Sequence, residues 1–360
     1  MHPAEVPVRA LKNLLRIIGV VALSALAGEL LLFAFGFPNG IQVHETDLRT
    51  YDDELVYRLR PGVLIAGKRT PYFVHPEIRT NSMGLRDREF AVPKPAGRFR
   101  ILSLGDSYAF GWGVASEETY AQRLEQALNA DDPGRALEVV NAGVPSYESW
   151  RELALLDRLG PAVQPDLVIC QVADNDLGSE GGRWKHAGLP VPSWALRLGR
   201  SSRLATALST LASSGLEGVR ELRAHAAGED TVPRSQRSVG DYMRELAAAN
   251  DSAFVRDEPW TDEIIDNYER MNDRARGAFV CLLLPNRYQI YAGEYRDAAL
   301  GILEARLARR GVRALNLCSY LRARNSEPLC LADTHPNPRG HQRIADTLAV
   351  YLKNAGLVDL

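Results

Sequence analysis

The sequence predicts an α/β protein built on a flavodoxin-like, doubly wound, five-stranded parallel sheet. Short apolar runs alternate with helical patterns from residue 98 onward, which is typical of parallel strands covered by helices on both faces. Side chains that are 46% hydrophobic and 24% charged are enough to bury the core of an ordinary globular protein. We expect strands at residues 100–104, 137–141, 166–172, 278–284 and 312–317. We expect helices at residues 119–128, 148–159, 262–276, 294–310 and 338–354.

The charge of the chain argues against a nucleic-acid partner. The 43 basic and 45 acidic residues are interspersed and sum to a formal net charge of −2. Binding to a phosphate backbone requires a basic stripe or patch, and the sequence has none. We therefore expect no nucleic acid among the partners.

An apolar stretch at residues 15–37 follows a short tail at residues 1–14. As a helix the stretch would be about 34 Å long, enough to cross a bilayer core. Arg9, Lys12 and Arg16 crowd its N-terminal side, and such charges favour the cytoplasmic side of a membrane. We expect a single-pass anchor in the inner (cytoplasmic) membrane with the following domain periplasmic or extracellular.

Two other interpretations of this stretch stay open. It can be a cleaved signal peptide whose small-residue site is Ala25-Leu26-Ala27, or a buried helix of the globular domain. Against cleavage, the apolar run continues through residues 30–35, which a signal peptide does not need.

The rest of the chain divides into two further parts. Residues 38–97 hold short extended stretches punctuated by proline and glycine, which predicts a small β-rich linker domain. Residues 98–360 form the main domain, with an insertion at 178–260 between its third and fourth strands. The insertion can be a lid, a partner surface or a solvated decoration.

The four cysteines carry little chemistry. Cys170 and Cys281 lie in apolar runs and are expected as small core residues. Cys318 and Cys330 flank a polar loop and, in an exported domain, could form a disulfide. No spacing of Cys and His indicates a zinc site, so we expect no metal.

The strongest chemical signal is Ser107, in a Gly-Asp-Ser turn that directly follows the first strand of the expected sheet. A serine there lies at the carboxyl edge of the sheet, where ligands bind. Its hydroxyl needs a base, and His335 is the candidate because Asp333, two residues away, can orient the imidazole. Asp106 is expected to support the turn, and His341 to be structural.

Two further motifs follow the second and third strands, at Gly143 and Asn175. With Ser107 and His335 they resemble the four blocks that name the SGNH/GDSL hydrolase family, over residues 98–354. The resemblance implies the SGNH hydrolase fold, a catalytic triad of Ser107, His335 and Asp333, and an oxyanion hole formed by Ser107, Gly143 and Asn175. Fixed donors at such a hole stabilise the negative charge that acyl transfer places on the carbonyl oxygen.

The third and fourth blocks depart from the usual family pattern. Ala173 stands where the family has glycine, and Asp174 is an additional acid before Asn175. The last block is Asp-x-His, a spacing that also occurs in relatives acting on bacterial exopolysaccharides. This spacing favours an acylated glycan as the substrate.

These observations predict a serine esterase, an ester hydrolase that removes O-acyl groups, in particular O-acetyl, from an envelope or secreted glycan through an acyl-enzyme. No metal or organic cofactor is implied, and the partners expected are the acylated carbohydrate and the membrane. One alternative is an O-acetyltransferase that passes the acyl group to a polysaccharide hydroxyl. The other is a non-catalytic scaffold or glycan-binding subunit that has kept the fold.

Overall fold

The computed structural model divides the chain into two compact units, each considered by itself. One comprises residues 1–46 and 188–236, and the other comprises residues 47–187 and 237–360. The structure describes residues 8–34, 48–65, 67–69, 74–130, 137–173, 176–177, 248, 253–291, 298–331 and 334–358.

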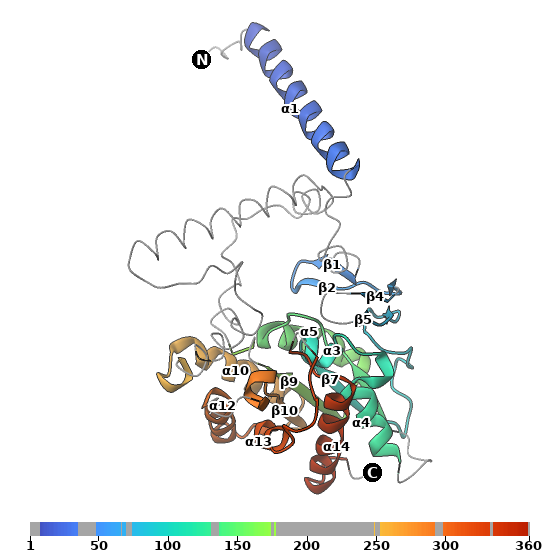
Figure 1. The fold of residues 1–360 in the computed structure, drawn as a ribbon, viewed down its shortest axis with the longest axis vertical. Coiled ribbons are helices and arrows are strands. Elements are labelled where there is room, and N and C mark those ends of the chain that lie inside the picture. Colours follow the sequence, from blue (N-terminus) through green and yellow to red (C-terminus); the bar gives the residue numbers. More distant parts are fainter. Residues whose placement is uncertain are drawn as a thin grey trace. The chain divides into compact units, whose positions relative to one another are not determined.

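The second unit is built on one five-stranded parallel sheet (Figure 1). Its strands are β7 (Phe99–Leu104), β8 (Leu137–Asn141), β9 (Leu167–Val172), β10 (Phe279–Leu283) and β11 (Arg313–Asn316). The spatial order of the strands is β11-β10-β9-β7-β8. The second strand in sequence, β8, lies on one side of β7 and the later strands lie on the other, which is the flavodoxin-like arrangement. The predicted fold class is confirmed. Strands β7, β8, β9 and β10 are buried on both faces and so appear in the sequence as short apolar runs, whereas the edge strand β11 is only partly buried.

Helices cover both faces of this sheet. The longer ones are α4 (Tyr120–Asn129), α5 (Ser149–Val163), α10 (Pro259–Arg274), α12 (Ala298–Arg309) and α14 (Pro338–Asn354). Successive residues of β7 enter different cores: Leu102 packs with α5, α10 and α12, and Ile101 packs with α4 and α14. Short elements were not expected, since they are too short to show a helical period: α3 (Ser107–Phe110), η1 (Ser116–Glu118), α11 (Arg287–Tyr291) and α13 (Cys318–Arg322).

The region before the sheet forms three small antiparallel pairs. The strands pair as β1 (Arg49–Asp52) with β2 (Val56–Leu59), β3 (Leu64–Ile65) with β6 (Ile78–Arg79), and β4 (Lys68–Arg69) with β5 (Val74–His75). Leu55, Leu59 and Leu85 from this region are buried in the same core cluster as α5. The region therefore belongs to the compact unit of the sheet.

Helix α1 (Val8–Ala34) is the described element of the first unit. Several of its apolar side chains are more than half exposed, among them Leu23 at 69%. In the described part of the chain, no helix meets the length and hydropathy that a membrane span requires. The predicted anchor at residues 15–37 is therefore not supported, and residues 35–37 lie outside the described ranges.

Two other expectations concern the insertion and the cysteines. Most of the 178–260 insertion, predicted as a lid, a partner surface or a solvated decoration, lies outside the described residues. Cys170 and Cys281 are buried in strands, as expected of core residues. Cys318 and Cys330 are thiols, so the structure does not contain the disulfide considered for them.

Candidate active site

The turn between β7 and α3 carries Ser107 as the first residue of the helix. Asp106 caps α3: its Oδ1 accepts a hydrogen bond of 2.8 Å from the Tyr108 N–H, the supporting role expected from the sequence. Gly105 has a φ of +144°, and an added Cβ there would lie 2.6 Å from Oε1 of Gln171. Glycine is therefore required at the tightest point of the turn.

Gln171 on the neighbouring strand β9 holds the same turn through its side chain. Its Oε1 accepts hydrogen bonds from the N–H groups of Asp106, at 3.2 Å, and Ala109, at 3.1 Å. These two amides flank Ser107, and Gln171 is completely buried. Sequence reasoning missed this residue because its only signal is a polar side chain within a continuous apolar strand.

Arg86 supports the far end of α3. Its guanidinium donates to the carbonyl oxygens of Phe110 (2.8 Å), Gly111 (2.5 Å) and Val114 (2.6 Å). Burial lowers the pKa of Arg86 to about 10, so the side chain stays charged at neutral pH. A buried cation thus donates hydrogen bonds to carbonyl groups at the end of α3 and in the loop that follows it.

The loop that carries His335 is closed mainly by its own backbone. The Leu331 N–H donates to the His335 carbonyl at 2.7 Å, and Cys330 forms an antiparallel bridge with Pro336. Thr334 adopts a φ of +88°, which is uncommon for a residue other than glycine. The Tyr108 hydroxyl donates to the Thr334 carbonyl at 3.3 Å and so ties this loop to α3.

Helix α14 begins directly after the loop. The side chain of Asn337 caps it by accepting a hydrogen bond of 2.9 Å from the Gly340 N–H, and Pro338 occupies the first helical position. A Cβ at Gly340 would lie 2.2 Å from the Leu329 carbonyl oxygen. The end of the histidine loop is therefore held by local contacts that the residue types favour.

The two loops bring Ser107 and His335 together, although 228 positions separate them in the sequence. Nε2 of His335 lies 2.8 Å from Oγ of Ser107, within hydrogen-bond distance. The Tyr108 ring packs beside the imidazole, with 5.2 Å between ring centroids. In this arrangement the imidazole can take the serine proton as the hydroxyl attacks an acyl carbon.

The other predicted site residues are placed only in part. Asp333 and Asn175 lie outside the described residues, so their proposed roles stay predictions. Gly143 lies after β8, and its N–H donates to Oδ1 of Asn141 at 3.0 Å. A Cβ at Gly143 would come within 2.2 Å of the Phe110 nitrogen, so only glycine allows this loop to lie against α3.

Buried acids lie beneath the site. Glu152 on α5 accepts a hydrogen bond of 3.0 Å from the Cys170 thiol, and burial raises the pKa of Glu152 to about 8. Burial also raises the pKa of Asp176 well above its usual range, although its Oδ2 accepts a bond of 2.7 Å from the Ala173 N–H. Both carboxyl groups are completely buried, and burial disfavours the charged form of each.

The remaining candidate, His341, is structural. His341 is buried, its Nδ1 accepts a hydrogen bond from the Tyr120 N–H at 3.1 Å, and burial lowers its pKa to about 3. Across the part of the chain that is described, no group of three or more His, Cys, Asp or Glu side chains is placed to hold a metal ion.

A doubly wound sheet with a serine–histidine pair at the carboxyl edge defines a serine hydrolase. A profile of the GDSL-like lipase/acylhydrolase family matches residues 103–343. This match covers more than half of the sequence, so the chain belongs to that family. It is accordingly a serine esterase.

The solved structures that the chain matches share little sequence with it. TesA is 16% identical, the match covers 71% of this chain and 98% of TesA, and the TM-score is 0.40. The lipase Lip_vut3 from a goat rumen metagenome is 14% identical, with coverages of 70% and 96% and a TM-score of 0.40. A two-domain esterase active on acetylated mannans is 16% identical, with coverages of 72% and 50% and a TM-score of 0.40. A search of curated proteins gave no match.

Proposed function

We propose that the chain hydrolyses O-acyl esters through an acyl-enzyme formed on Ser107. The observation that carries this proposal is the distance of 2.8 Å between Ser107 Oγ and His335 Nε2. A serine hydroxyl is a weak nucleophile at neutral pH, and an imidazole at this distance is the base it needs.

The reaction then proceeds in two halves. His335 takes the Ser107 proton as Oγ attacks the ester carbonyl, and it returns that proton to the alcohol oxygen as the carbon–oxygen bond of the ester breaks. In the second half, His335 takes a proton from water, the resulting hydroxide attacks the acyl-serine, and Ser107 regains its proton as the free acid leaves.

We assign the supporting roles as the family resemblance implies. Asp333 orients the imidazole, and the oxyanion receives hydrogen bonds from the N–H groups of Ser107 and Gly143 and from the side-chain amide of Asn175. Ser107 is the first residue of α3, so its N–H has no acceptor within the helix. The Gly143 N–H already donates to Asn141, so it must share that bond with the substrate oxygen or shift toward it.

For the substrate we propose O-acetyl groups on an envelope or secreted glycan. The Asp-x-His spacing of Asp333 and His335 supports this class, as does the expected position of the domain outside the cytoplasmic membrane. That position is itself a proposal, which rests on the basic residues before the apolar stretch at 15–37. A reporter enzyme fused after residue 37 and active only in the periplasm would test it.

Covalent labelling tests the mechanism most directly. A fluorophosphonate should label the wild-type chain and a Ser116→Ala control equally, and Ser107→Ala should not be labelled. Labelling of Ser107→Ala at the wild-type rate would refute the assignment of the nucleophile. Aryl acetate turnover that is equal in wild type and Ser107→Ala would instead favour the non-catalytic scaffold.

The acyl group and its acceptor are tested with substrates. Aryl acetate should be hydrolysed faster than aryl octanoate if acetyl is the natural acyl group. Incubation of an acyl donor with a polysaccharide, followed by mass spectrometry, separates hydrolysis from transfer: we expect free acid only. Acylated polysaccharide in the products would show the O-acetyltransferase alternative.

A further inference from the structure

The loop of residues 143–147, which follows β8, is held by side chains from the β1–β2 hairpin. The Tyr57 hydroxyl reaches two successive carbonyl oxygens of the loop, Pro145 at 2.8 Å and Ser146 at 3.1 Å. Nη2 of Arg49 donates to the same Pro145 oxygen at 2.8 Å. The Tyr147 hydroxyl donates in return to the Tyr57 carbonyl at 2.6 Å. The 143–147 loop and the hairpin are therefore joined in both directions.

The register of the hairpin explains why both side chains reach the 143–147 loop. Tyr51 lies opposite Tyr57, and Arg49 lies two residues before Tyr51 on the same strand. Since side chains alternate along a strand, Arg49 and Tyr57 share one face of the hairpin. The Arg49 guanidinium stands 4.3 Å from the centre of the Tyr57 ring, which adds a cation–π contact.

The 143–147 loop needs such support because its backbone is strained. Ser146 has a φ of +64°, in the left-handed region that residues other than glycine rarely adopt. Its carbonyl also accepts from Arg151 on α5, at 3.0 Å. Bonds to the carbonyls of Pro145 and Ser146 thus fix a backbone conformation that the residues do not prefer.

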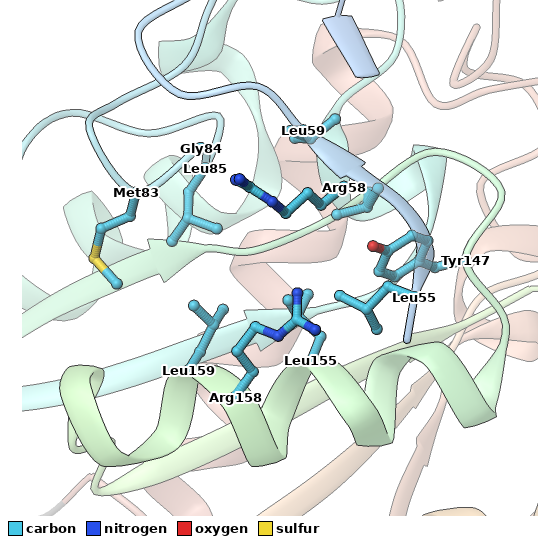
Figure 2. A pocket seen from close by; sticks show the side chains of 11 residues that line it. Leu55, Arg58, Leu59, Met83, Gly84, Leu85, Tyr147, Leu155, Arg158 and Leu159 are labelled. Atoms are coloured by element: carbon cyan, nitrogen blue, oxygen red, sulfur yellow. The ribbon is translucent and has the colours of Figure 1, made fainter. Parts of the chain in front are cut away.

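The hairpin is itself anchored to α5 at its turn. Arg158 donates to both carboxylate oxygens of Asp52, at 2.6 and 3.0 Å, and this pairing lowers the pKa of Asp52 to about 2. Between the hairpin and α5 lies a cavity of about 130 Å³, lined by Leu55, Leu155 and Leu159 among others (Figure 2). Polar contacts therefore act together with the burial of Leu55 and Leu59 to hold the hairpin against α5.

A second contact from the same region reaches the start of the 143–147 loop. Oδ2 of Asp87 accepts a hydrogen bond of 2.7 Å from the Asn141 N–H, and Asn141 in turn accepts from the Gly143 N–H. Asp87 is buried, and its burial raises its pKa to about 6. The region before the sheet therefore holds the backbone on both sides of Gly143.

From these contacts we infer that Tyr57 is a positioning residue for the ester hydrolysis, acting through the 143–147 loop on the Gly143 N–H. The inference rests on the proposed function, because Gly143 matters to the rate only as an oxyanion donor. Residues 49–59 precede the part of the chain that matches the family profile, residues 103–343. The support that Tyr57 provides is therefore an addition to the matched family region.

Variants of the full-length chain test this role. Tyr57→Phe keeps the ring and removes only the hydroxyl that reaches the 143–147 loop. We expect kcat for an aryl acetate to fall about 10-fold with KM within twofold, less than the loss of a direct oxyanion donor would cause. Fluorophosphonate labelling of Ser107 should slow by a similar factor, since it also passes through an oxyanion.

Arg49→Met provides a second variant and a coupling measurement. Arg49 and Tyr57 donate to the same carbonyl oxygen, so either can hold the 143–147 loop in part when the other is lost. We therefore expect the double variant to lose about 100-fold or more in kcat, beyond the product of the two single losses. If the loss of kcat in the double variant equals the product of the two single losses, Arg49 and Tyr57 do not act together on the 143–147 loop.

The matched control is Thr80→Val. Thr80 lies in the same region, is buried, and donates to the Arg60 carbonyl at 2.6 Å without contacting the 143–147 loop. Urea unfolding should show similar destabilisation for Thr80→Val and Tyr57→Phe, with kcat reduced only in the latter.

Two results would overturn the inference, and they are distinguishable. If Tyr57→Phe keeps the kcat of Thr80→Val while wild type hydrolyses the ester, the positioning role fails and the proposed function stands. If wild type neither turns over aryl esters nor reacts with the fluorophosphonate, the proposed function fails and the positioning role fails with it.

Discussion

The serine side and the histidine side of the site are held in place by different kinds of contact. The turn around Ser107 depends on partners that are distant in the sequence, namely Gln171 on β9 and Arg86 before the sheet. The loop around His335 is closed largely by residues close to it in the sequence. The Leu331 N–H donates to the His335 carbonyl, and the Asn337 side chain caps α14. The serine side should therefore be more sensitive to changes far from the site.

The largest effect expected is the loss of either member of the pair. Ser107→Ala and His335→Ala should each lower kcat/KM for an aryl acetate by about 10⁴-fold or more, because nucleophile and base act as one unit. The double variant should be no worse than the single ones. Steady-state kinetics on purified variants measures this, and independent, multiplying losses would contradict a joint role.

Arg86→Met should produce the largest loss of stability on the serine side. It removes the donor from three carbonyl oxygens in the core, those of Phe110, Gly111 and Val114. We expect the free energy of unfolding to fall by about 3 kcal/mol or more.

Urea denaturation measures the effect of Arg86→Met, with Arg79→Met as the control. Arg79 lies in the same region, but its side chain is 68% exposed. Its replacement should change the free energy of unfolding by less than about 0.5 kcal/mol. Equal effects of the two substitutions would show that the buried guanidinium does not support α3.

Glu152→Gln should change how stability depends on pH. Burial raises the pKa of Glu152 from its ordinary value of 4.5 to about 8, so between these values the folded chain holds a proton that the unfolded chain has released. Wild-type stability should therefore fall as pH rises through this window, by up to about 1.4 kcal/mol per pH unit from this group.

The Glu152→Gln variant lacks that contribution. Its stability relative to wild type should rise between pH 4.5 and 8 and then level off. The charge of Glu152 is also one of the causes that raise the pKa of Asp176, after burial, so the substitution lowers the pKa of Asp176 as well. Urea unfolding at pH 5, 6.5 and 8 measures the difference, and a difference that is constant across these pH values would mean that Glu152 does not take up a proton on folding.

The smallest effect is expected on the histidine side. Asn337→Ala removes one cap of α14, which should cost about 1 kcal/mol of stability. Because the backbone contacts around His335 remain, kcat should change by less than about threefold. A loss of kcat comparable with that of His335→Ala would show that the histidine loop depends on this cap, and the contrast between the two sides would not hold.

Much of the fold was predictable from the sequence. The four buried strands and the five longer helices have strong apolar patterns, and both β8 and α14 have the predicted bounds. The short helices α3, α11 and α13 were not predictable, because one turn of helix has no period to detect. The predicted membrane span is not supported by the described part of the chain.

The site was predictable to a lesser degree. Ser107 and His335 could be named because each lies in a recognisable motif. The structure places Oγ of Ser107 2.8 Å from Nε2 of His335. Gln171, Arg86 and Tyr57 were not named, since nothing around them in the sequence distinguishes a supporting side chain from an ordinary polar residue. Their importance comes from the backbone groups they contact.

The sequence by itself determined where the strands lie along the chain, the two motifs that supply Ser107 and His335, and the glycines on which the turns depend. These features are local, because strand periodicity and turn chemistry depend on neighbouring residues. Only the tertiary structure decided which buried side chains hold the backbone around Ser107 and Gly143. Those contacts join positions up to 96 residues apart, and the folded sheet is what brings them together.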